Sequence, residues 1–312
     1  MIKRTVYFGN PAYLNLSDDQ LIVKLPEIVK NDTIPENFKK EAIATIPIED
    51  LGIIVLDHPR ITITQGLIEK LLENNVAIIT CDKHHLPTGL LLPLCGNTLQ
   101  SERFKDQISA SEPLKKNIWQ QTIEAKIRNQ ANVLKKHGYS SDNMNYWSDS
   151  VKSGDTGNHE ARAAAYYWGN IFQKTHPSFT RDRDGDPPNN LLNYGYSILR
   201  GVVARSLVAS GLLPTLGVHH HNKYNAYCLA DDIMEPYRPY VDEVVLKIMK
   251  SIVDYKELTK EIKAELLTIP VLDVMIDGNK SPLMIGVQKT TTSLVRCFNG
   301  EIRKVLYPVL ED

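Results

Sequence analysis

The hydrophobic pattern changes its period about a third of the way along the chain, and this change limits the fold more than any other feature. The first part reads as short β-prone runs separated by turn residues, at 5–8, 21–25, 42–48, 51–56 and 76–80. One helix is expected among them, at 65–74, with Thr64 as its N-cap. Residues 90–93 and the Gly96-Asn97 pair resemble a linker.

Beyond residue 98 the apolar residues recur at helical spacing. We expect helices at 114–136, 158–172, 189–210, 240–255 and 293–306, with Gly211 just past a helix end. The chain of 312 residues is long enough for two modest domains. The fold class expected is therefore α+β, with a small β-rich N-terminal domain (1–95) followed by an all-α C-terminal domain (96–312).

The composition is that of a soluble globular protein, with 42% hydrophobic and 23% charged residues. No apolar run approaches the length of about 20 residues that a membrane span needs. The first residues lack the apolar stretch of a secretory signal, and the four cysteines show no disulfide-like spacing. These features predict a cytoplasmic protein that does not bind a membrane.

The net charge of −1 does not favour a DNA-binding protein, unless the charges are segregated. Basic residues do concentrate between positions 103 and 137, at Arg103, Lys105, Lys115, Lys116, Lys126, Arg128, Lys135 and Lys136. This run is either a surface that contacts DNA phosphates or one solvated helix face.

Glu160 lies near the start of the predicted helix 158–172. On a helix it shares a face with Ala163, Ala164, Tyr167 and Ile171. A carboxylate on such a face is either paired or bound to a cation, because an unpaired buried charge is costly. The alternative is an acid that complements the helix dipole, and the position taken alone favours that interpretation.

Three successive histidines, His219, His220 and His221, occupy a predicted loop after Gly211. Imidazole nitrogens bind metal ions near neutral pH. Consecutive residues do not face the same way, so at most one or two could bind the same ion. A polar loop of surface histidines is an equal alternative.

Asp232 and Glu235 are spaced so that one helical turn places both carboxylates on one side. Pro236 and Pro239 limit this turn and the helix that follows. An acidic helix start is the common alternative. The combination with Arg238 and with a histidine 15 residues upstream of Glu235 favours a site.

One histidine with two or three carboxylates suits Mg²⁺ or Mn²⁺, which neutralise a phosphodiester transition state. The same ligands would bind Zn²⁺ more tightly, so ligand type alone leaves the metal open. The sequence has no phosphate-binding Gly-rich loop, dinucleotide turn or Ser/His/Asp signature.

With these motifs in order, the whole chain resembles the CRISPR-associated integrases, the nuclease subunit that inserts captured DNA into a repeat array. Four motifs carry the resemblance: His159-Glu160-Ala161 with Tyr167-Trp168, Asn190-Leu191-Leu192-Asn193-Tyr194-Gly195-Tyr196, Gly217-Val218-His219-His220, and Asp232-Ile233-Met234-Glu235-Pro236-Tyr237-Arg238-Pro239. Two further runs resemble the branch found beside single-protein RNA-guided effectors (type II), Leu56-Asp57-His58-Pro59 and Asn97-Thr98-Leu99-Gln100-Ser101-Glu102-Arg103.

The resemblance implies that Glu160, His220 and Glu235 are metal ligands. Asp232 matches a further acidic position, either a ligand or a group that supports one. A shift of one residue in the histidine loop would replace His220 with His219.

The resemblance also implies the organisation and the reaction. The N-terminal domain would mediate homodimerisation, and the helical domain would bind the metal and double-stranded DNA. Two dimers would flank a dimer of a small ferredoxin-like CRISPR-associated partner as a heterohexamer, with the RNA-guided effector as a further candidate partner. The 3′-hydroxyl of a captured fragment would attack a repeat-end phosphodiester in antiviral spacer acquisition, and hydrolysis of DNA would be the variant with water.

Further candidate DNA or active-site contacts follow from the same motifs. Tyr167 shares the face of Glu160, although a helix-packing tyrosine is the more common case. Asn190 and Asn193 could contact a phosphate or cap a helix, and Arg238 could reach a phosphate or pair with a carboxylate. In the basic run, Arg103, Lys126 and Arg128 are candidates for the DNA backbone.

Two other functions stay open on the sequence. One is a related integrase from a mobile element that joins its own ends. The other is a DNA-binding scaffold without catalysis, in which the acidic cluster is structural.

Overall fold

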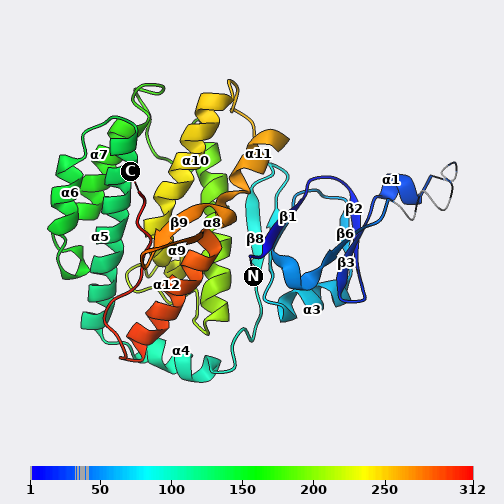
Figure 1. Cartoon of the computed structure of the whole chain (residues 1–312), viewed down its shortest axis with the longest axis horizontal. Coiled ribbons are helices and arrows are strands. Elements are labelled where there is room, and N and C mark those ends of the chain that lie inside the picture. The colour runs from blue at the N-terminus through cyan, green and yellow to red at the C-terminus, as the bar shows by residue number, and fades with distance from the viewer. Residues whose placement is uncertain (1, 32, 34, 36–38, 40–41, 312) are drawn as a thin grey trace. The chain divides into compact units, whose positions relative to one another are not determined.

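The computed structural model describes residues 2–31, 33, 35, 39 and 42–311. The chain forms two compact units, Met1–Gly96 and Asn97–Asp312, coloured blue to cyan and cyan to red in Figure 1. No described helix is long and apolar enough to cross a membrane.

The N-terminal unit contains two four-stranded sheets. The first has the order β1-β5-β7-β8, in which β1, β5 and β7 are parallel and β8 is antiparallel to β7. The second has the order β4-β3-β2-β6. The bounds are β1 Arg4–Phe8, β2 Ala12–Ser17, β3 Gln20–Lys24, α1 Pro26–Val29, β4 Ala44–Pro47, a 3₁₀ turn Ile48–Asp50, β5 Leu51–Leu56, β6 Ile61–Ile63, α3 Gln65–Glu73, β7 Ala77–Cys81 and β8 Pro87–Leu91.

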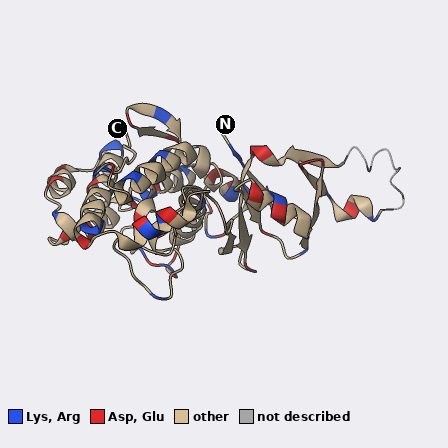
Figure 2. Cartoon of the chain, turned by 90° about the horizontal axis from the view of Figure 1, so that it is seen from below, with Lys and Arg blue, Asp and Glu red and all other residues tan. Residues whose placement is uncertain are grey.

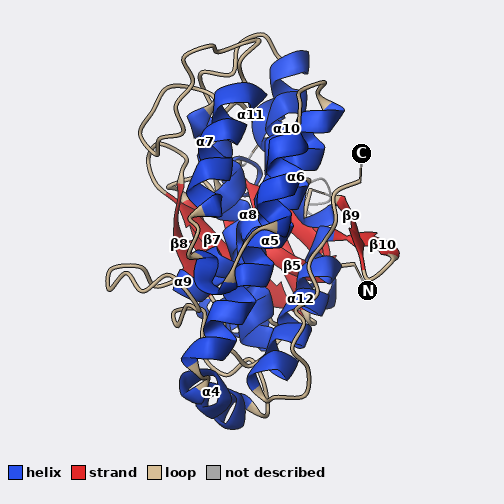
Figure 3. Ribbon diagram, turned by 90° about the vertical axis from the view of Figure 1, so that its left-hand side faces the viewer, coloured by secondary structure: helices blue, strands red, loops and turns tan. Residues whose placement is uncertain are grey.

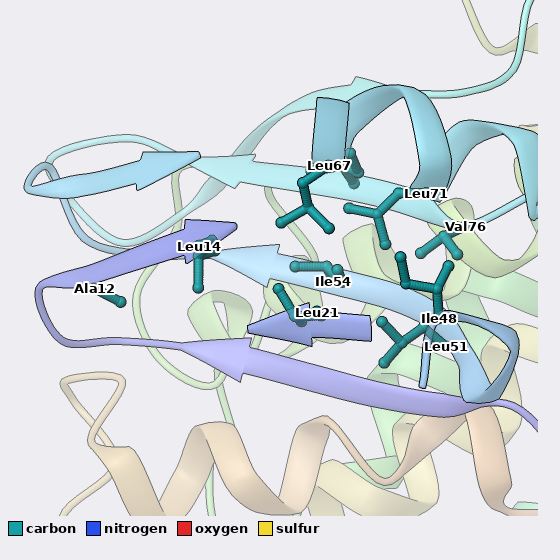
Figure 4. Packing of buried hydrophobic residues seen from close by; sticks show 10 residues of the cluster. Ala12, Leu14, Leu21, Ile48, Leu51, Ile54, Leu67, Leu71 and Val76 are labelled. Carbon is teal, nitrogen blue, oxygen red and sulfur yellow. The ribbon is translucent and has the colours of Figure 1, made fainter. Parts of the chain in front are cut away.

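The core of this unit is formed by apolar side chains from both sheets and from α3. Leu67 and Leu71 of α3 are fully buried and point toward the strands (Figure 4). β5 is buried almost along its whole length, as expected of a strand with a parallel neighbour on each side. The β-prone runs and the helix at 65–74 are therefore confirmed.

Three strands of this unit were not predicted from the sequence: β2, β6 and β8. The expected linker at 90–93 is wrong in part, because Leu90 and Leu91 pair with β7 at the end of β8. Gly89 opposes Thr80 in this pairing. Because β8 contains a proline and a glycine, which are typical of turns, the sequence did not predict this strand.

The C-terminal unit is a helical bundle around α8 (Asn189–Ala209), which packs against α9, α10, α11 and α12 (Figure 3). The other bounds are α4 Gln100–Ser109, α5 Glu112–Lys136, α6 Asp142–Asp149, a 3₁₀ turn Ser153–Asp155, α7 His159–Ile171, α9 Cys228–Met234, a 3₁₀ turn Glu235–Tyr237, α10 Arg238–Ser251, α11 Lys260–Leu266, a 3₁₀ turn Ile269–Val271 and α12 Leu283–Phe298. Gly211 has φ +76° directly after α8, as its predicted role at a helix end requires.

Two expectations for this unit are wrong in detail. It is not all helical, because β9 (Asp273–Ile276) and β10 (Asn279–Pro282) form an antiparallel hairpin. Asp277 and Gly278 turn this hairpin with positive φ. The last helix begins earlier than predicted and ends at Phe298, so residues 299–306 are not helical.

Candidate active site

Glu160 is positioned by a cap at the start of α7. The carboxylate of Asp155 accepts hydrogen bonds from the backbone N–H groups of His159 and Glu160, both at 2.9 Å. These N–H groups have no partner inside the helix, so Asp155 satisfies the helix end. Glu160 lies in the first turn of α7, where it complements the helix dipole, and its side chain is available for another contact.

That contact is with Lys126, which lies between two carboxylates. Its Nζ is 2.8 Å from Oε1 of Glu160 and 2.7 Å from Oε2 of Glu235. Only 10% of the Lys126 side chain is exposed. Burial alone would lower the pKa of Lys126, but the charges of Glu235 and Glu160 outweigh it and raise the pKa above its ordinary value. Lys126 is therefore a charged group inside the site, not part of a solvent-exposed basic track.

Glu235 has a second cationic partner. Oε1 lies 2.9 Å from Nε of Arg238, and the Glu235 side chain is 8% exposed. Burial would raise its pKa, but the charges of Arg238 and Lys126 lower it below the ordinary value. Asn129 of α5 donates to the carbonyl oxygen of Pro236 at 2.8 Å and so fixes this turn against α5.

His220 is oriented by Asp232. Its Nδ1 lies 2.5 Å from Oδ1 of Asp232, and Oδ2 accepts hydrogen bonds from the N–H groups of Val218 (2.8 Å) and His219 (3.0 Å). Asp232 is fully buried, and a side chain at Gly217 would collide with it and with the carbonyl of His220. The hydrogen bond to Asp232 raises the pKa of His220 despite burial. Asp232 thus shapes the loop and holds Nδ1, which leaves Nε2 of His220 for a ligand.

The three histidines have different surroundings. The ring of His219 stacks on Trp119 of α5, with centroids 4.1 Å apart and planes 2° from parallel. His220 meets the same indole edge-on at 5.5 Å. All three histidines are exposed, so their ring contacts and not their overall exposure distinguish them. Burial, helped by the charge of His220, lowers the pKa of His219. His220 differs from its neighbours because a carboxylate fixes one of its nitrogens.

The other candidates from the motifs lie away from this cluster or below the surface. Tyr167 is fully buried and donates to Oδ2 of Asp242 at 2.9 Å, so its predicted contact with DNA is wrong in this conformation. Asn190 donates to the carbonyls of Tyr255 and Lys256.

Asn193 binds the loop before α8. Its Nδ2 donates to the carbonyl of Arg183 at 2.6 Å, and its Oδ1 accepts from Arg181. Like Asn190, it therefore holds a neighbouring loop and does not cap its own helix.

The basic run divides into residues with different partners. Arg103 donates to the carbonyl of Ser210 at 2.6 Å, at the end of α8. Arg128 pairs with Asp149 at 3.0 Å. Basic and acidic residues alternate along the helices of this unit (Figure 2). The ion pair of Arg128 with Asp149 favours the interpretation of this residue as part of a solvated helix face and not as a contact to DNA phosphates.

Several residues of the site were missed from the sequence: Asp155, Trp119, Arg181 and Asp242. Asp155 could have been found, since an acid shortly before an alanine-rich helix is a capping signal. Trp119 and Asp242 have no local signal, because their partners come from distant parts of the chain. Arg181 binds Asn189 and Asn193, which follow it by 8 and 12 residues, but it lies in a loop without a periodic pattern.

Comparisons with known proteins identify the family of the chain. Residues 7–269 match the family model described as CRISPR associated protein Cas1. The chain is 36% identical over 251 residues to a CRISPR-associated endonuclease Cas1 from Neisseria meningitidis, covering 80% of this chain and 81% of the relative. The chain belongs to the Cas1 family.

Two solved structures share the fold of this Cas1 family member. A casposase bound to integration product has a TM-score of 0.77 at 20% identity, with 98% of this chain and 92% of that chain covered. The Cas1 protein of Thermotoga maritima has a TM-score of 0.72 at 16% identity, with 96% and 98% covered. The resemblance to the CRISPR-associated integrases is thereby confirmed, and so is the mixed fold of N-terminal strands followed by a helical part.

Proposed function

We propose that this chain is a divalent-metal-dependent DNA integrase and endonuclease that joins captured DNA to a CRISPR repeat array. The observation that carries the proposal is the convergence of Glu160 and Glu235, from different helices, on one cation inside the protein. Two carboxylates this close repel each other unless a cation lies between them. The site is therefore built to hold positive charge.

The donor set fits Mg²⁺ or Mn²⁺. Glu235 Oε2 is buried and, although 2.7 Å from Lys126, has no well-aligned hydrogen bond. In the described part of the chain no three His, Cys, Asp or Glu side chains gather around one point, and the ammonium of Lys126 stands between the two carboxylates. We infer that Glu160, Glu235 and Nε2 of His220 hold the metal and that Lys126 yields part of this space to it. Asp232 and His219 then support the ligands without binding the ion.

The protein groups prepare the site for phosphoryl transfer. Asp232 accepts a hydrogen bond from Nδ1–H of His220, which favours the tautomer with a free lone pair on Nε2. Arg238 and Lys126 keep Glu235 ionised. A bound divalent ion supplies charge stabilisation at the attacking and leaving oxygens.

In the proposed reaction the 3′-hydroxyl oxygen of the fragment forms a bond to phosphorus of a repeat-end phosphodiester. The bond from that phosphorus to the 3′-oxygen of the repeat strand breaks. The attacking hydroxyl gives its proton to solvent, and the leaving 3′-oxygen takes up a proton to become a hydroxyl. The number of phosphodiester bonds is unchanged. With water in place of the hydroxyl, the same groups would hydrolyse DNA.

Partners follow from the relatives. One structural neighbour is a Cas6-RT-Cas1–Cas2 complex, with TM-score 0.73 and 99% of this chain covered, which supports a Cas2-type partner. We infer that the chain works as a homodimer through its N-terminal unit, that two dimers flank a partner dimer as a heterohexamer, and that an RNA-guided effector of a type II system takes part. A cytoplasmic location suits this work.

A mobile-element integrase is the second candidate, favoured by the casposase likeness. The greater identity to a Cas1 endonuclease, 36% against 20%, supports the CRISPR role. Purified chain and partner, incubated with a 3′-hydroxyl fragment and a plasmid bearing the repeat array, should yield joined products only with Mg²⁺ or Mn²⁺. Joining that ignores the repeat would favour the mobile-element role, and DNA binding without joining would favour the scaffold.

A further inference from the structure

Arg181 is a half-buried arginine that forms no ion pair with a carboxylate of the described residues. It lies in the segment between α7 and α8, outside the motifs discussed above. Its Nη1 donates to the carbonyl of Asp182 at 2.8 Å and to Oδ1 of Asn189 at 2.9 Å, and its Nη2 donates to Oδ1 of Asn193 at 2.7 Å. All three acceptors are neutral, so the positive charge is held in place but not neutralised.

The two asparagines hold Arg181 and its loop together. They lie one turn apart on α8, and both turn their amide oxygens to the guanidinium. Their amide nitrogens donate to backbone carbonyls of the loop, Asn189 to Thr180 and Asn193 to Arg183. The guanidinium is therefore oriented before any ligand arrives, which reduces the entropy lost on binding.

The bonds leave donors free for a ligand. They use both N–H groups of Nη1 and one of Nη2, and the described residues offer no acceptor to Nε–H and the second N–H of Nη2. Two donors on adjacent nitrogens can bind two oxygens of one phosphate.

A second arginine lies beside it, across one aromatic ring. The guanidinium of Arg181 is 5.4 Å from the ring centroid of Tyr196, and that of Arg238 is 4.6 Å from the same centroid. Arg238 contacts Glu235 in the candidate active site. Burial and the charge of Arg238 lower the pKa of Arg181, as expected where two cations lie close together.

The charges of Asp242 and Asp182 offset that of Arg181 only in part, and neither carboxylate forms an ion pair with it. Glu235 is shared between Arg238 and Lys126. Both oxygens of Asp242 accept hydrogen bonds from tyrosine hydroxyls, those of Tyr167 and Tyr196. Two arginines therefore lie next to a site for a phosphodiester, and Arg181 forms no ion pair with a carboxylate of the described residues, so its guanidinium can bind an anion.

We propose that Arg181, with Arg238, binds a backbone phosphate of the DNA strand that enters the active site, next to the phosphate that reacts. The inference rests on the proposed function for its substrate. It adds a subsite that fixes the register of the strand. Arg181 is a substrate-binding residue in this account, and Asn189 and Asn193 position it.

The test is metal-free binding of a fluorescein-labelled DNA duplex by the full chain, measured by fluorescence anisotropy at several salt concentrations. Arg181→Gln is expected to weaken binding about tenfold, the effect of losing a hydrogen-bonded charge. It should also reduce the slope of log K against log salt by about 0.9, the loss of one phosphate contact. Arg296→Ala is the control, because Arg296 pairs with Glu301 on the surface and should change neither quantity.

A second variant covers loss of folding. Asn193→Asp places a carboxylate on Arg181 and is expected to reduce affinity and slope in the same way. An unchanged salt slope in both variants, with thermal unfolding like that of the wild type, would overturn the inference. If Arg181 only held the loop in place, its loss would change stability but not the number of counterions released on DNA binding. If wild-type chain binds DNA with the full slope yet never joins it with metal, the proposed function fails and this subsite stands.

Discussion

The ammonium of Lys126 lies 2.7 Å from Oε2 of Glu235, and both side chains are at most 10% exposed. Arg238 pairs with Glu235 alone, so this lysine is the cation that contacts both Glu235 and Glu160. Lys126→Met should therefore destabilise the metal-free protein by about 3–5 kcal/mol, the usual cost of leaving buried carboxylates unpaired. Added Mn²⁺ should raise the melting temperature of this variant more than that of the wild type.

The matched control is Lys115→Met, which breaks an ion pair with the exposed carboxylate of Glu112 and should change stability by less than about 1 kcal/mol. A Lys126→Met protein as stable as the wild type, or unresponsive to Mn²⁺, would contradict this view of the site.

The role of Asp232 can be separated from that of a ligand. Asp232→Asn keeps the shape of the side chain but weakens its hold on Nδ1 of His220 and on the loop N–H groups. We expect Mn²⁺ affinity, measured by calorimetric titration, to fall about 10–100-fold. Complete loss of binding, equal to that of Glu235→Gln, would mean that Asp232 itself holds the ion.

The histidine triplet gives three graded variants. His220→Ala should abolish measurable Mn²⁺ binding because it removes a ligand. His219→Ala, which removes the stack on Trp119, should have a smaller effect, and His221→Ala should have none. The same titration checks all three, and a reversed order of His219 and His220 would show that the loop is shifted by one residue.

Asp242 predicts a pH dependence of stability. It is 1% exposed, and burial raises its pKa to about 7, although hydrogen bonds from Tyr196 and Tyr167 oppose the rise. Its ordinary pKa is 3.8, so between these values the folded protein binds more protons than the unfolded chain. This contribution makes the free energy of unfolding fall as pH rises from about 4 to about 7, by on the order of a few kcal/mol.

Asp242→Asn removes that contribution. The free energy of unfolding of the variant, relative to the wild type, should therefore increase across this pH range, as urea denaturation at a series of pH values will measure. Asp142→Asn, at an exposed residue, serves as the control. Parallel curves for Asp242→Asn and the wild type would mean that Asp242 ionises normally.

The sequence predicted the elements of this fold better than the contacts of its site. Long periodic segments such as α5 and α8 were recognised because one face repeats over several turns. The short strands β2 and β6 were not, since their own hydrophobic pattern is weak; β6 in addition pairs only with the distant β2, whereas β2 also forms a hairpin with β3. The β9–β10 hairpin, with the polar run Asp277-Gly278-Asn279-Lys280, was hidden between helices.

In the site, local motifs identified Glu160, His220 and Glu235, but not what each one contacts. Lys126 was a candidate only as one of many basic residues, and its place between two carboxylates depends on packing of α5 against α7 and the turn Glu235–Tyr237. Arg181 gave no signal, because a loop arginine has no periodic pattern, its partner Asn189 was given no role, and its partner Asn193 was interpreted as a helix cap or a phosphate contact.

The central claim, that Glu160 and Glu235 hold a catalytic divalent ion, is tested most directly by strand transfer. Wild-type chain, Glu160→Gln and Glu235→Gln would each be incubated, with the partner, a 3′-hydroxyl fragment and the repeat plasmid, in EDTA, Mg²⁺ or Mn²⁺. We predict joined product only for the wild type and only with metal, with both variants folded by thermal unfolding. Joining by either folded variant at the wild-type rate, or by the wild type in EDTA, would contradict the claim.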